Sequence, residues 1–218
     1  MFIGHFGTGL AAKKLDSKIS LGTLFLAAQF IDLLWPIFLL LGLEKVKIEQ
    51  GNTTFTPLNF ISYPYSHSLF GVLIWSLLFG SIYFLYRKNI KSALLLAALV
   101  MSHWILDLIT HRPDLPIIPF GDIKVGFGLW NSVIFTMLIE GSIFGVGAFL
   151  YISCTKAENK KGKIGLWSLL AFLVIIYLMN IFGSPPPSEK AIAVAGLFQW
   201  LLIGWAYWID KNRAPKAE

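Results

Sequence analysis

The chain contains a single cysteine, Cys154, among its 218 residues. One thiol excludes an intramolecular disulfide and a zinc site built from cysteines. Histidine is also scarce, with four residues that all lie within the first 111 positions. The sequence has no internal repeat and no low-complexity tract, and its first basic residues, Lys13 and Lys14, follow an apolar stretch instead of preceding one. We therefore expect no cleaved secretory signal.

Apolar residues, by contrast, make up 56% of the chain and aromatic residues 15%. Several apolar runs approach the ~20 residues that an α-helix needs to cross a bilayer. The candidate spans are residues 21–43, 67–86, 93–111, 130–154, 166–182 and 191–209. We therefore expect an all-α polytopic membrane protein, a bundle of about six transmembrane helices. Because the spans use most of the chain, residues 1–218 are expected to form one integral membrane domain without a soluble domain.

The distribution of basic residues predicts the orientation of this bundle. Of the 18 Lys and Arg residues, 13 lie before the first span, in alternate loops and after the last span, and the other loops hold five. The positive-inside rule then places both termini in the cytoplasm and the loops around residues 51 and 113 outside. The net charge of +6 thus reflects membrane topology, and we expect no nucleic-acid partner.

Residues 1–12 precede the first span and include three glycines. This segment is too short to cross a bilayer and too apolar for a free tail. We therefore expect it to lie in the membrane interface or to re-enter the membrane.

The most informative stretch is the outer half of the third span. His103, Asp107 and His111 are spaced at i, i+4 and i+8, which places them on one face of a helix. At about 1.5 Å per residue, Asp32, His103 and Glu140 all fall near the bilayer midplane. An ionisable side chain at that depth costs several kcal/mol unless it is paired, hydrated or bound to a metal. The polar residues therefore predict a functional cavity that opens towards the outer face.

Imidazole and carboxylate groups suit zinc, manganese or iron, and a catalytic centre needs about three protein ligands and one open position. His67, at the outer end of the second span, is a further candidate ligand beside the third span. Two other interpretations of the same residues are a proton relay and a structural hydrogen-bonded cluster. In the structural interpretation, Asp32 and Glu140 form hydrogen bonds to neighbouring helices and have no catalytic role, and Arg112 pairs with Asp114.

Four short motifs occur in order along the chain: Gly4-His5, the buried Asp32, the segment Tyr65-Ser66-His67-Ser68-Leu69, and Ser102-His103 followed by Asp107. Over roughly residues 1–116 this pattern resembles the LexA-regulated inner-membrane family of proposed metal-dependent hydrolases. That family has a Gly-His start, a Pro-Asp-hydrophobic-Asp-His segment, a Thr-His-Ser-Leu segment and a Ser-His-x-x-x-Asp segment.

The resemblance implies a bacterial inner-membrane protein with a zinc ion and phospholipase-like hydrolysis. It also makes His5 part of the site, so that residues 1–12 re-enter the membrane and place His5 beside Asp32 and His103. The sequence departs from the family pattern where Asp32 stands alone in the first span, and where Tyr63, Pro64 and Tyr65 replace an expected arginine. His111 is a candidate for the missing ligand.

We therefore predict a hydrolase that acts on a lipid or lipid-linked phosphate or ester from the outer side of the membrane. Asp32 or Glu140 is the expected general base, and Arg112 the expected contact of an anionic headgroup. The alternatives are a metal-ion or proton transporter and a non-catalytic structural membrane protein. Residues 130–209 are expected to serve mainly as scaffold. The expected metal ligands are His5, Asp32, His67, His103, Asp107 and His111.

Overall fold

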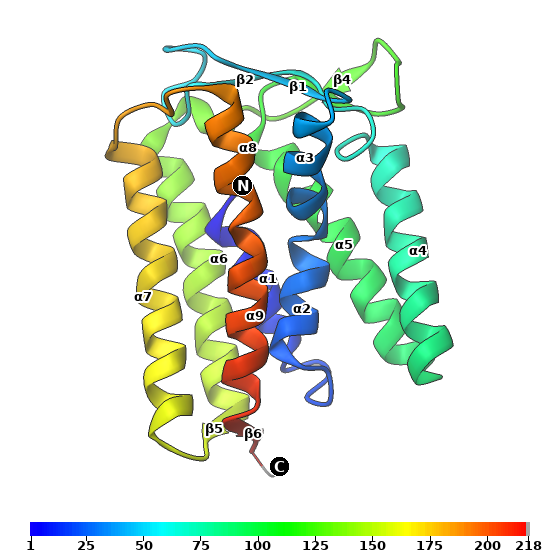
Figure 1. Ribbon diagram of the computed structural model, residues 1–218, viewed down its shortest axis with the longest axis vertical. Helices are drawn as coiled ribbons and strands as arrows, with labels where there is room; N and C mark the ends of the chain where they lie inside the picture. Colours follow the sequence, from blue (N-terminus) through cyan, green and yellow to red (C-terminus); the bar gives the residue numbers. More distant parts are fainter. Residues whose placement is uncertain (217–218) are drawn as a thin grey trace.

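Long apolar helices run side by side along one axis of the molecule in the computed structural model, which describes residues 1–216 (Figure 1). Among these residues, five helical segments are long and apolar enough to cross a membrane. They are α4 (Leu69–Arg87), α5 (Ile90–Thr110), α6 (Val133–Cys154), α7 (Lys160–Phe182), and α8 (Glu189–Leu197) with α9 (Gln199–Asp210). A bent pair, α2 (Leu21–Ala28) and α3 (Phe30–Leu40), forms the sixth. The predicted all-α architecture of about six spans is confirmed, with the bent pair counted as one span.

The first span is broken, although its hydropathy predicted one continuous helix over residues 21–43. The axes of α2 and α3 meet at 55°. At Gln29, between them, ψ is 4°, far from the roughly −42° of a regular α-helix. Helix α3 also contains Pro36, which has no N–H to donate to the preceding turn. The bend places the start of α3, including Asp32, inside the bundle.

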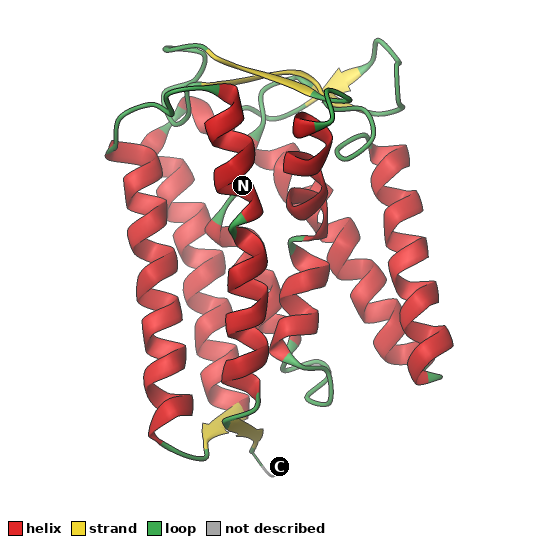
Figure 2. Cartoon of the chain, viewed as in Figure 1, coloured by secondary structure: helices red, strands yellow, loops and turns green. Residues whose placement is uncertain are grey.

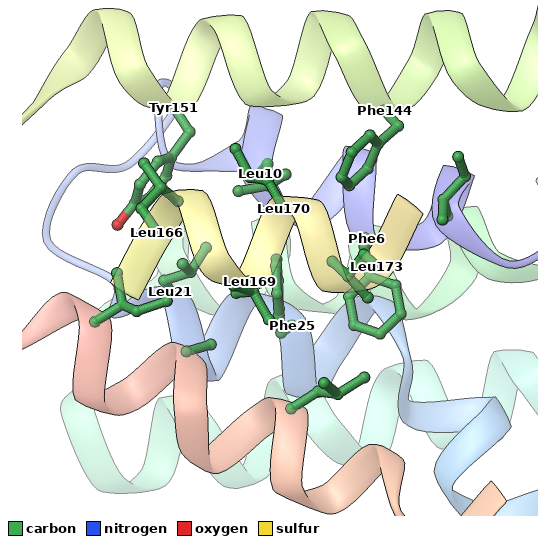
Figure 3. Close-up of a cluster of buried hydrophobic side chains, with 14 of the residues drawn as sticks. Phe6, Leu10, Leu21, Phe25, Phe144, Tyr151, Leu166, Leu169, Leu170 and Leu173 are labelled. Atoms are coloured by element: carbon green, nitrogen blue, oxygen red, sulfur yellow. The ribbon is translucent and has the colours of Figure 1, made fainter. Parts of the chain in front are cut away.

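Helix α1 (Ile3–Ala12) enters the bundle from the chain start and is almost entirely buried. It packs on α6, α2 and α5, and its Phe6 and Leu10 belong to the apolar core with Phe25, Phe144 and Leu169 (Figure 3). The segment before the first span therefore re-enters the molecule, which is one of the two arrangements expected from the sequence.

Glycine permits the close approach of α1 to α6. A Cβ atom on Gly7 would lie 2.7 Å from the carbonyl oxygen of Ile143, and one on Gly147 would collide with the carbonyl oxygen of Gly7. Only backbone with no side chain fits at this crossing.

We expect Gly147→Ala to destabilise the fold by about 1 to 3 kcal/mol, because the new methyl group forces α1 away from α6. Thermal unfolding of the purified protein in detergent measures this effect. Gly145→Ala is the matched control, since a Cβ there meets no atom within 4 Å. Equal stability of the two variants would contradict the close packing of α1.

The two ends of the bundle carry different loops (Figure 2). One end carries the antiparallel pairs β1 (Lys45–Ile48) with β2 (Leu58–Ser62) and β3 (Leu115–Pro116) with β4 (Lys124–Val125), followed by the short helix η1 (Leu129–Asn131). We call it the strand-rich end. The other, which we call the basic end, carries β5 (Thr155–Ala157) paired with β6 (Arg213–Pro215) and the segments that hold 13 of the 18 basic residues.

Candidate metal centre

Four elements bring five of the predicted residues together inside the strand-rich half of the bundle. His103 and Asp107 lie one turn apart on α5, Asp32 lies in the first turn of α3, His5 lies on α1, and His67 lies in the turn before α4. The side chains of His5, His67, His103 and Asp107 are buried, and that of Asp32 is 20% exposed. Asp32 is therefore the side chain of this cluster that reaches the molecular surface.

The two imidazoles of His67 and His103 face the same two carboxylates. His103 Nε2 lies 3.2 Å from Asp107 Oδ2 and 3.5 Å from Asp32 Oδ1. His67 Nε2 lies 3.7 Å from Asp107 Oδ2 and 3.5 Å from Asp32 Oδ1. Each imidazole nitrogen thus lies within 3.7 Å of both carboxylates, and the sequence expectation that His67, His103 and Asp107 lie close together agrees with these distances.

His103 presents only one nitrogen to the cluster. Its Nδ1 lies 2.9 Å from the carbonyl oxygen of Ala28, the last residue of α2. A carbonyl can only accept, so Nδ1 carries a proton, and only Nε2 is left to bind a metal. Nε2 is buried and has no hydrogen-bond partner among residues 1–216. A buried nitrogen of this kind, beside two carboxylates, is well suited to a cation.

His5 lies against His103 and contacts the other oxygen of Asp107. The two imidazole rings stack at 3.6 Å between centroids and 8° between planes, and His5 Nε2 lies 3.1 Å from Asp107 Oδ1. The nitrogen of Met1 lies 2.5 Å from the same oxygen. These contacts hold Asp107 so that Oδ2 faces His67 and His103.

Two groups of side chains in the described part of the chain have the spacing of metal ligands. One consists of Asp32, His67 and His103, and the other of His5, His103 and Asp107; in each group the donor atoms lie within 4.8 Å of one another. Both groups need Nε2 of His103. A single nitrogen lone pair binds one ion, so the two groups cannot each hold a metal ion at the same time.

Glu140, a predicted general base, belongs to α6, and its side chain contacts the start of α1. Its Oε2 accepts hydrogen bonds from the backbone N–H groups of Phe2 at 2.8 Å and Gly4 at 3.4 Å. The first N–H groups of a helix have no partner within the helix, and a carboxylate there is favourable. Glu140 from α6 thus holds the first turn of α1 in place.

His111 lies apart from the cluster, although the helical spacing predicted one column with His103 and Asp107. Helix α5 ends at Thr110, and His111 has an extended backbone with ψ of 146°. Its Nδ1 lies 3.0 Å from Asp114 Oδ1, which also accepts a hydrogen bond from the Tyr63 hydroxyl at 2.7 Å. The structure therefore places His111 in a separate hydrogen-bonded group.

Burial sets the protonation of this second group. It lowers the pKa of His111 despite the nearby carboxylate of Asp114. Burial also acts to raise the pKa of Asp114, but the hydrogen bonds from His111, Tyr63 and Arg112 hold that pKa below its usual value. We therefore describe the pair at neutral pH as a neutral imidazole donating to a carboxylate.

Arg112 lies near the molecular surface beside this group and makes no hydrogen bond to the five clustered side chains. Its Nε donates to Asp114 Oδ2 at 3.2 Å, and an amino nitrogen donates to Asn59 Oδ1 at 2.5 Å. Arg112 and Lys124 both line a surface pocket of about 400 Å³ at the strand-rich end.

Ser66 and Glu44 were not among the site residues predicted from the sequence. Ser66 Oγ lies 2.7 Å from His67 Nδ1, and Glu44 Oε2 accepts a hydrogen bond from Ser66 Oγ at 2.7 Å. A hydroxyl directly beside a candidate ligand was a usable signal for Ser66. Glu44 had none, because it precedes Ser66 by 22 residues and only the fold brings them together.

A family model described as YdjM inner membrane protein matches residues 3–185 of the chain. No curated protein and no solved structure matches it.

Proposed function

The chain belongs to the YdjM inner membrane protein family, and on this premise and the geometry of its buried cluster we propose that it is a metal-dependent hydrolase. Its proposed substrate is a lipid or lipid-linked phosphate or ester, reached from the outer side of the inner membrane. The observation that carries this proposal is that Nε2 of His67 and Nε2 of His103 each lie 3.2 to 3.7 Å from both Asp107 Oδ2 and Asp32 Oδ1.

These separations suit a small divalent cation. Nitrogen and oxygen ligands bind zinc at about 2.0 to 2.2 Å, so the corners of a regular tetrahedron lie about 3.3 to 3.6 Å apart. The mixture of imidazole and carboxylate fits zinc well. We assign His103, which both groups share, with His67 from one group and Asp107 from the other as the ligands, and His5 as the residue that orients Asp107. A zinc ion held there would lower the pKa of a water molecule and polarise a phosphoryl or acyl oxygen.

Asp32 is the proposed general base. It is the most exposed carboxylate of the cluster, so a water molecule entering from solvent meets its side chain first. Asp32 Oδ1 also lies 3.5 Å from both imidazole nitrogens, which places it beside the ligands. Glu140 is less suited to this task, because one of its oxygens already holds the start of α1.

The substrate class follows from the membrane setting and from charge. The basic end of the bundle, by the positive-inside rule, faces the cytoplasm, so the strand-rich half with the cluster faces outward. Arg112 and Lys124 line a pocket at that end and would attract an anionic headgroup. A lipid diffuses within the outer leaflet to this side of the protein, which favours it over a soluble substrate.

A transport function has less support. Towards the basic end, the residues that follow His5 on α1 pack into an apolar core, where Phe6, Leu10 and Phe25 are fully buried (Figure 3). A conducting path for a cation needs polar groups through the whole membrane. The cluster therefore favours a site over a channel.

Chelation tests the proposal directly. We expect the protein, reconstituted in vesicles of inner-membrane phospholipids, to release either headgroups or fatty acids, as detected by mass spectrometry. Removal of the metal with a chelator should abolish product release, and added zinc should restore it. Hydrolysis that survives complete metal removal would contradict the metal requirement. Zinc uptake into the vesicles without any hydrolysis would support transport instead.

A further inference from the structure

Glu44 is a buried carboxylate outside the proposed ligand set. It follows the end of α3, and its relative exposure is 2%. Oε1 accepts hydrogen bonds from the backbone N–H groups of Tyr65 at 2.9 Å and Ser66 at 2.8 Å. Oε2 accepts one from Ser66 Oγ at 2.7 Å. A buried carboxylate with three hydrogen bonds from one turn is held in a single orientation.

The Ser66 hydroxyl connects this carboxylate to His67. A serine hydroxyl has one proton, and an ionised carboxylate can only accept. Ser66 therefore donates to Glu44 and must accept from its other neighbour, His67 Nδ1, at 2.7 Å. His67 then carries its proton on Nδ1.

The consequence falls on the other nitrogen of His67. In the neutral imidazole with its proton on Nδ1, Nε2 carries the lone pair, and this is the atom that faces Asp32 and Asp107. We propose that Glu44 and Ser66 are positioning residues, a carboxylate–hydroxyl–imidazole relay that sets the tautomer and orientation of His67 for metal binding. The proposal rests on the proposed function only where it concerns the metal.

The relay that orients His67 differs from the hydrogen bond that orients His103. His103 Nδ1 donates directly to a backbone carbonyl, which no side-chain substitution removes. His67 depends on two side chains, so its tautomer can be changed by mutation. Hydrogen-bond partners of this kind make a ligating imidazole more basic and hold its ring.

The tautomer can be measured without a metal. Long-range ¹⁵N–¹H spectra of ¹⁵N-histidine-labelled, metal-free protein distinguish Nδ1–H from Nε2–H, and the chain has only four histidines. His67→Asn assigns the His67 signals. We expect the Nδ1–H form in the wild type and in Ser66→Thr, which keeps the hydroxyl. Ser66→Ala, which has no hydroxyl, should lose the preference of His67 for the Nδ1–H form. Glu44→Gln should favour Nε2–H, because the amide can donate to Ser66 and turn its hydroxyl towards His67.

Zinc affinity gives the second measurement. Competition with a chromophoric chelator should show affinity about 10- to 100-fold weaker in Ser66→Ala and Glu44→Gln. Ser66→Thr should bind like the wild type. Ser68→Ala is the matched control: Ser68 is also fully buried but caps α4 through Gly71, so its loss affects stability without touching His67. Unchanged signals from the other three histidines report a retained fold.

The outcomes separate this proposal from the proposed function. His67 in the Nε2–H form in metal-free wild type would overturn the relay. So would zinc affinity in Ser66→Ala equal to that of the wild type. An Nδ1–H tautomer that Ser66→Ala removes, in a protein that binds no zinc, would support the relay while contradicting the metal-dependent hydrolase.

Discussion

Replacing His103 by alanine is expected to remove the metal from the purified protein. Its Nε2 lies 3.2 Å from Asp107 Oδ2 and 3.5 Å from Asp32 Oδ1, and both candidate ligand groups need it. Without this nitrogen, two carboxylates and His67 remain around a buried void. Elemental analysis of detergent-purified protein should find about one zinc per chain in the wild type and close to none in His103→Ala.

His111→Ala is the control for this experiment. It removes the same side chain from the end of the same helix, and His111 is also buried. Its partners, however, are Asp114 and Tyr63, and it belongs to neither ligand group. We therefore expect full zinc content in His111→Ala. Loss of zinc in both variants would show that His111 is a ligand, and retention in both would contradict the proposed site.

Asp32→Asn is expected to retain the metal and to lose most of the hydrolytic activity. The amide keeps the size of the side chain but cannot accept a proton from water. Removal of a general base typically lowers the rate about 10² to 10⁴-fold. The expected result is therefore wild-type zinc content with kcat reduced by that factor, measured on the lipid substrate that the vesicle assay identifies.

Glu140→Gln is the matched change for Asp32→Asn, and it compares the two carboxylates that the sequence offered as bases. The amide oxygen of glutamine can still accept from the N–H groups of Phe2 and Gly4, so α1 should stay in place. We expect activity close to that of the wild type. A large loss of kcat in Glu140→Gln alone would make Glu140 the base. Loss of zinc in Asp32→Asn would identify Asp32 as a ligand.

The features that depend on neighbouring residues along the chain were predictable from the sequence alone. Apolar runs predicted the six spans, because hydropathy over ~20 residues suffices to recognise a membrane helix. The i, i+4 spacing of His103 and Asp107 predicted that both face one side of α5, since helical periodicity needs no tertiary information. The short motifs also indicated the family, and the family model now extends over residues 3–185, well beyond the first half of the chain.

Which of these side chains meet depends on the tertiary fold. His111 shares the spacing of His103 and Asp107, but the helix ends at Thr110, so periodicity no longer places its side chain. The break at Gln29 leaves the Ala28 carbonyl free to accept from His103, and hydropathy carries no signal for such a bend. Glu44 meets Ser66, and Glu140 meets the start of α1 across 138 positions. These contacts depend on how helices pack in three dimensions, and a single sequence contains no periodic pattern that encodes them.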